Sequence, residues 1–158
     1  MGRLDINGTF IGTTADGVRL GTNDVYSASD PASSSLLTIR PEALFVNRVR
    51  AIQRAIINQG NLQANPGSNL TLSADEINNN GSINVPSGNV FLEAVNGDIN
   101  LTNIDTRDGI NGGGDINISA TGNINFNGIV DASGGEFILD PETFQTEIRS
   151  NSIANGGN

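Results

Sequence analysis

Gly88-Asn-Val-Phe-Leu92 is one copy of a short phrase that recurs through residues 58–139, in which a glycine precedes two apolar residues separated by one other residue. Strict alternation places both apolar side chains on the same face of a β-strand. Gly, Asn, Asp and Ser residues between the copies are typical of turns. The stretch therefore predicts many short strands. The other copies are Gly97-Asp-Ile-Asn-Leu101, Gly114-Asp-Ile-Asn-Ile118 and Gly122-Asn-Ile-Asn-Phe126, with variants at 68–72 and 81–85.

The copies also recur at a longer period. The pairs Leu70-Leu72, Val90-Leu92, Ile116-Ile118 and Phe137-Leu139 begin 20, 26 and 21 residues apart, and each interval contains one or two further short strands. Such a period is typical of repeat architectures. We expect an all-β parallel β-helix of about three to five coils, stacked about 4.8 Å apart. Its core is expected to include a ladder of Leu72, Leu92, Ile118 and Leu139.

An antiparallel β-sandwich is the alternative fold. Asn80-Gly81, Asn96-Gly97 and Asn127-Gly128 resemble the two-residue turns of β-hairpins. A sandwich, however, gives no reason for a phrase that recurs about every 21 residues, so the period favours the β-helix.

Composition limits the classes of function. The 158 residues allow one domain, with 36% hydrophobic and only 4% aromatic residues, which suits a thin aliphatic core. The net charge of −9 makes nucleic acid an unexpected partner, because binding to phosphates depends on Lys and Arg. The absence of Cys and His removes thiolate chemistry, disulfides and the commonest general base.

The chain divides into three segments. Residues 1–35 are expected to be a polar lead-in or an amino-terminal cap, residues 36–141 the β-helix repeats, and residues 142–158 a carboxy-terminal tail. Within 41–57, apolar residues at spacings of four, three and four predict a helix that begins at Pro41 and ends before Gly60. The alternative is two strands, at 44–46 and 55–57, because Val and Ile favour strands.

Acidic residues in and around the longest turn, residues 105–114, offer two kinds of candidate site. Asp98, Asp105, Asp108 and Asp115 are the carboxylates nearest to a catalytic cluster, and Asp98 and Asp115 are expected to stack on neighbouring coils. A glycan-cleaving enzyme remains a minor alternative, because only Arg107 lies near them. A calcium site is the preferred candidate, because hard oxygen ligands suit Ca²⁺ on a Gly-rich loop. Its expected ligands are Asp105, Asp108, Asn111 and Asp115.

Several phrases resemble filamentous haemagglutinin-type exoproteins, most closely their cyanobacterial branch. They are residues 55–62, 67–72 and 83–90, together with 36–39, 113–119 and 138–141. The resemblance covers roughly residues 10–141. It implies a right-handed parallel β-helix, export by two-partner secretion through an outer-membrane β-barrel transporter, and adhesion without catalysis. It also implies strands in 41–57, where the spacing of apolar residues predicts a helix.

The chain departs from that family at its start. It lacks the family's amino-terminal signal peptide, Asn65-Pro66 poorly matches the family's Asn-Pro motifs, and an Arg-rich stretch at 48–54 replaces a short turn. We therefore expect a segment of a longer precursor, secreted or held at the cell surface.

The expected function is structural and adhesive, and the alternative is a calcium-stabilised stalk. The expected partners are the transporter, a surface glycan or protein ligand, and other copies of the chain. Copies are expected to associate end to end, because the first and last coils leave strand edges open.

Overall fold

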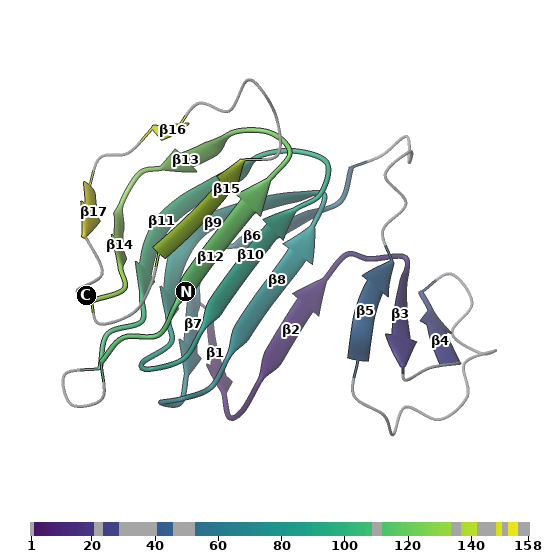
Figure 1. Cartoon of the computed structure of the whole chain (residues 1–158), viewed down its shortest axis with the longest axis horizontal. Helices are drawn as coiled ribbons and strands as arrows, with labels where there is room; N and C mark the ends of the chain where they lie inside the picture. The colour runs from purple at the N-terminus through teal and green to yellow at the C-terminus, as the bar shows by residue number, and fades with distance from the viewer. Residues whose placement is uncertain are drawn as a thin grey trace.

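The computed structural model describes residues 2–20, 24–28, 41–45, 53–108, 112–133, 137–141, 148–149 and 152–154. These residues form strands and turns, without a helix. Parallel strands stack into a β-solenoid (Figure 1). The expected parallel β-helix is confirmed, and the antiparallel sandwich is wrong because every strand pair within the stack is parallel.

Each coil contributes strands to three faces, here called A, B and C in chain order. Face A is a five-stranded parallel sheet with the order β15-β12-β10-β8-β2. Its strands are β2 (Phe10–Thr13), β8 (Leu70–Ala74), β10 (Val90–Ala94), β12 (Ile116–Ala120) and β15 (Phe137–Pro141).

Faces B and C share one sheet that bends along its length. Two long strands, β9 (Glu76–Asn84) and β11 (Ile99–Asp105), cross both faces. Face B also contains β6 (Ala55–Asn58), β13 (Ile124–Phe126) and β16 (Ile148–Arg149). Face C also contains β1 (Arg3–Ile6), β7 (Asn61–Ala64), β14 (Ile129–Asp131) and β17 (Ser152–Ala154).

The core consists of inward columns with one residue from each coil. On face A, Leu92 lies in register with Leu72 on one side and Ile118 on the other, and Ile118 lies in register with Leu139. This is the predicted ladder. Faces B and C add the columns Ile77–Ile99–Ile124 and Ile83–Ile104–Val130, all of them buried. Alternation in the sequence thus becomes a continuous apolar column in the stack.

A small antiparallel sheet interrupts the first coil between β2 and β6. It contains β3 (Gly17–Leu20), β4 (Asp24–Ser27) and β5 (Pro41–Phe45), in the order β4-β3-β5. Figure 1 shows it beyond β2, at the end of the stack opposite β15. Arg54 follows this excursion, and its Nη1 lies 3.2 Å from Oδ1 of Asp16.

The helix predicted for residues 41–57 is wrong where the structure describes this segment. Residues 41–45 form β5, and Ala55–Asn58 form β6, while residues 46–52 lie outside the described part. Ile56 of β6 lies in register with Ile77 in the core, whereas Ile57 faces outward. The strand alternative holds because pairing with β9 gives Ile56 a place in an existing apolar column.

Strands of both terminal segments join the stack. In the segment expected as lead-in or cap, β1 pairs with β7 and β2 pairs with β8. In the segment expected as a tail, β16 pairs with β13 and β17 with β14. Leu4, Ile11 and Ile57 are exposed on the first strands of the three faces. End-to-end association of copies stays a prediction.

Glycines at the corners allow the coils to approach closely. A Cβ on Gly88 would collide with the carbonyl oxygen of Ser68, and a Cβ on Gly114 with that of Gly88. Gly81 meets Gly60 in the same way. The positive-φ glycines of the described chain are Gly8, Gly67 and Gly112. The Asn-Gly pairs at 80–81, 96–97 and 127–128 are therefore corners of the solenoid and not hairpin turns.

We expect Leu92→Ala to lower the free energy of unfolding by about 2–5 kcal/mol, because Leu92 is fully buried between two neighbours of its column. Its neighbour Phe91 faces outward and is 40% exposed, so Phe91→Ala serves as the control, with a loss of about 0.5 kcal/mol. Equilibrium denaturation in urea measures both. Equal losses would contradict the assigned inward and outward faces.

Candidate functional site

The predicted calcium site stays a prediction, because the structure describes only three of its four ligands. Asp105 ends β11, Asp108 lies in the following loop, and Asp115 precedes β12. Asn111 lies outside the described residues. Oδ2 of Asp108 accepts a hydrogen bond from the Ser87 hydroxyl at 2.9 Å. Within the described ranges, no group of three or more His, Cys, Asp or Glu side chains is placed to hold a metal ion.

The expected stacking of Asp98 on Asp115 is wrong. Asp98 precedes β11 on face B, and its Oδ1 accepts a hydrogen bond from the Asn123 backbone N–H at 2.7 Å. Asp115 precedes β12 on face A, where its backbone N–H donates to Asn89 Oδ1 at 2.9 Å. Both residues follow a glycine and precede an apolar pair, but their copies of the phrase belong to different faces of the coil.

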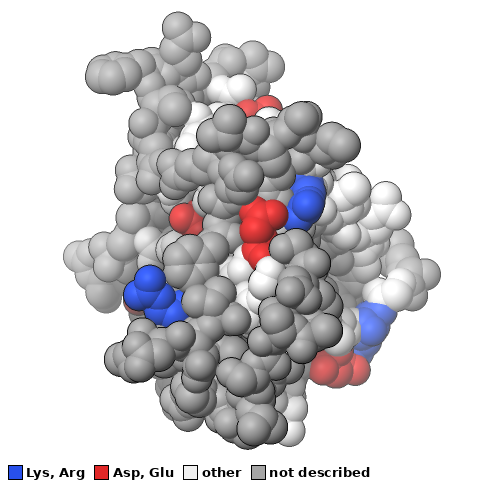
Figure 2. All heavy atoms as spheres, turned by 90° about the vertical axis from the view of Figure 1, so that its right-hand side faces the viewer, with Lys and Arg blue, Asp and Glu red and all other residues white. Residues whose placement is uncertain are grey.

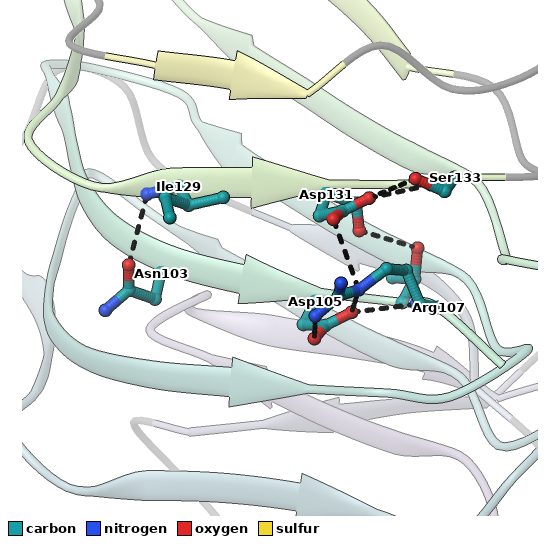
Figure 3. A network of polar contacts seen from close by, with 7 residues as sticks. Asn103, Asp105, Arg107, Ile129, Asp131 and Ser133 are labelled. Atoms are coloured by element: carbon teal, nitrogen blue, oxygen red, sulfur yellow. Dashed lines mark hydrogen bonds and ion pairs between the residues drawn. The ribbon is translucent and has the colours of Figure 1, made fainter. Parts of the chain in front are cut away.

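Arg107 joins two carboxylates from neighbouring coils. Asp105 and Asp131 lie in register on face C, which brings two like charges close together. Arg107 donates to Asp105 from Nε at 3.0 Å and from Nη2 at 2.7 Å, and its Nε lies 3.1 Å from Asp131 Oδ2. Figure 3 shows the guanidinium beside both carboxylates, with Ser133 above. The Ser133 hydroxyl donates to Asp131 Oδ1 at 2.6 Å.

The pairing favours the ionised forms of Asp105 and Arg107. The hydrogen bonds from the Arg107 side chain are the main cause of a lowered pKa of the Asp105 carboxyl, and partial burial opposes the shift. The same pairing raises the pKa of Arg107. A general acid near neutral pH requires a raised carboxyl pKa instead. The arrangement therefore links neighbouring coils electrostatically.

A second feature is a recess at the corner between faces B and C, here called the B–C recess. It has a volume of about 310 Å³. None of the residues that line it is charged, and most carry an amide or a hydroxyl group. They are Gln59, Gly60, Asn61, Asn80, Gly81, Ser82, Thr102, Asn103 and Asn127.

The B–C recess arises from one short corner. Three coils turn this corner with two residues, the second of which is glycine: 59–60, 80–81 and 127–128. In β11 the register shifts between Leu101 and Asn103, so Thr102 alone makes the corner. The Thr102 hydroxyl donates to the carbonyl oxygens of Asn79 and Gly81 in the coil beside it. The surface is therefore set back at Thr102, between wider corners on both sides.

Sequence reasoning missed this recess. The pairs at 80–81 and 127–128 were noticed only as turn signals. The available signal was the recurrence of a residue–glycine pair one coil apart, combined with its loss at Thr102. The site is therefore recognised by the number of residues in each corner, and not by the identity of any one residue.

Other features of the described surface point to no charged interface. In Figure 2, which faces the side where β3–β5 lie, the described Arg, Asp and Glu side chains occupy several separate points and no single patch. No helix with the length and apolarity needed to cross a membrane occurs in the described part of the chain.

The fold and corners define the class of protein as a short parallel β-solenoid with an antiparallel excursion in its first coil. No family model matches the sequence, and comparisons with curated proteins and with solved structures give no significant match.

We expect Arg107→Gln to lower the melting temperature at neutral pH, because Asp105 and Asp131 then face each other without a cation. A carboxyl pKa lowered by folding contributes stability above its unfolded pKa, and this contribution is lost as the pH falls through the folded pKa. The variant should therefore lose less stability than the wild type between neutral pH and values below about 4.

Arg3→Gln is the matched control. Arg3 also pairs with a carboxylate two residues away, at 2.6 Å, but both side chains are more than 60% exposed and no second carboxylate of the described residues pairs with Arg3. Exposed pairs of this kind contribute little. Thermal melts from pH 2 to 8 compare the three proteins. A variant profile parallel to that of the wild type would show that Arg107 does not hold the two carboxylates.

Proposed function

We propose that the chain is a structural and adhesive segment of a secreted or cell-surface exoprotein of the filamentous haemagglutinin type, and that it is not an enzyme. The observation that carries the proposal is the parallel β-solenoid, with the register that the recurring phrase predicts. A solenoid of this kind is compatible with an adhesin and does not by itself indicate one. The resemblance of the repeated phrases supplies the link to the family.

The outward polar columns support a role at a surface. On face B, the side-chain amide of Asn100 donates to Asn78 at 2.7 Å, and that of Asn125 donates to Asn100 at 2.9 Å. These amides satisfy one another along the stack and remain partly exposed. A column of uncharged polar groups suits a solvated surface that contacts other molecules without strong charge.

Stability without disulfides also fits the proposal. The chain has no Cys, so an extracellular form relies on strand pairing and on the apolar columns. Export by an outer-membrane transporter of the two-partner type is part of the proposal, and the resemblance alone supports it. The ligand would be a glycan or a protein on another surface.

Protease treatment of intact native cells tests the location. We expect an antibody raised against residues 58–139 to lose its signal after treatment, or to find the protein in the medium. A cytoplasmic protein probed in parallel must survive, which controls for leakage. A signal that persists until the cells are lysed would overturn the proposal, because adhesion requires exposure.

A calcium-stabilised stalk is the alternative reading of the same fold. If the adhesive proposal is right, addition of roughly 1–5 mM Ca²⁺ leaves the melting temperature unchanged. This concentration would saturate a calcium site with the affinity usual for extracellular modules. A rise that disappears in an Asp108→Asn variant would favour the stalk, because a ligand that binds only the folded state stabilises it. Asp5→Asn, on exposed β1, is the control for a general effect of charge.

A further inference from the structure

We propose that the B–C recess binds a neutral carbohydrate. The proposal rests on the adhesive function above, to which it gives a site and a class of ligand. Three observations carry it: the recess is built into the coil geometry, its lining residues are uncharged and most of them carry an amide or a hydroxyl group, and its size fits a small part of a glycan chain.

The recess is a fixed part of the fold. Its floor is the one-residue corner at Thr102, whose hydroxyl is bonded to the coil beside it. On the other side, the backbone N–H of Ile129 donates to Asn103 Oδ1 at 3.1 Å. The Ser82 hydroxyl donates to Asn61 Oδ1 at 3.0 Å. These parts of the lining are therefore held in place without a ligand, and a preformed site lowers the cost of ordering flexible groups.

The chemistry of the lining selects the class of ligand. A sugar hydroxyl both donates and accepts hydrogen bonds, and amide and hydroxyl side chains do the same. Gln59, Asn80 and Asn127 all line the recess and are exposed, so their amides are accessible to a ligand. Since no lining residue carries a positive charge, the recess offers no charge-assisted hydrogen bond to a phosphate, a sulfate or a carboxylate, which favours a neutral ligand.

The size of the recess limits the ligand. Small-molecule sites usually measure about 300–1,000 Å³, and the recess lies at the lower end of that range. One or two sugar units fit such a volume. The recess spans four successive coils, from Gln59 in the first to Asn127 in the fourth, so its long direction follows the axis of the stack. A glycan chain would therefore lie along the solenoid.

The test uses the purified full chain and immobilised gluco-, galacto- and manno-oligosaccharides, with sialylated and sulfated glycans for comparison. We expect binding to one or more neutral oligosaccharides, and the strongest of them is then titrated by calorimetry. The double variant Asn80→Ala/Asn127→Ala should weaken binding about tenfold, because each lost hydrogen bond contributes about 0.5–1.5 kcal/mol. Asn117→Ala, on the outer side of face A, is the matched control and should bind as the wild type does.

A second variant removes the recess without removing a polar group. A glycine inserted after Thr102 restores the two-residue corner of the neighbouring coils, so the floor should rise and binding should be lost. Circular dichroism and melting confirm that each variant folds. The two variants are judged separately, so that misfolding of one leaves the other decisive.

Three results would overturn the assignment: no neutral oligosaccharide bound, a preference for charged glycans, or binding that both folded recess variants retain. This failure is distinct from failure of the proposed function. If the chain is exposed on cells but binds no neutral glycan, the assignment of the recess as a carbohydrate site is wrong. The adhesive proposal then stands, with another face as the binding surface. A chain that binds through the recess but stays inside cells overturns the exoprotein proposal and leaves the recess assigned.

Discussion

Backbone hydrogen bonding between successive coils is the constraint from which the rest of this structure follows. At the start of face A, the N–H of Phe10 donates to Asn69 O, that of Leu70 to Asn89 O, and that of Val90 to Asp115 O, at 2.8–2.9 Å. Parallel strands in this pattern lie about 4.8 Å apart, and residues in register share one face. The neighbours of each side chain are therefore the residues in register with it on the two adjacent coils.

This constraint treats apolar, polar and charged columns differently. Leucine and isoleucine columns bury each other, and the Asn78, Asn100 and Asn125 amides pair along their column. Like charges in register repel, so Asp105 and Asp131 require the guanidinium of Arg107. At three corner positions, the same closeness excludes a side chain: Gly81, Gly88 and Gly114 lie where a Cβ would meet the carbonyl of the coil beside it.

The ladder of Leu72, Leu92, Ile118 and Leu139 followed from the sequence because alternation and period together determine register. The helix predicted for residues 41–57 is wrong because the spacing of apolar residues by four, three and four also fits one face of a helix. That spacing does not show that strands such as β9 are available for pairing. The antiparallel sheet of β3, β4 and β5 escaped for a related reason: its strands lie outside the repeat, and nothing in the period marks them.

The candidate sites divide along the same line. The candidate carboxylates between Asp98 and Asp115 are close in sequence, but the sequence does not say on which face each one lies. Asp98 and Asp115 belong to different faces. The B–C recess depends on one missing residue in one corner, at Thr102. A count of chemical groups does not detect such a feature, whereas a comparison of corner lengths between coils does.

The uniform rise of the coils makes the fold a molecular ruler. Each coil consumes about 20–26 residues here, by the spacing of the face A strands, and extends the stack by about 4.8 Å. Duplication of one coil lengthens the rod by a fixed step and presents the same outer faces again. The number of repeats therefore determines the length of a longer protein built this way. An excursion such as that between β2 and β6 adds mass without adding length to the stack.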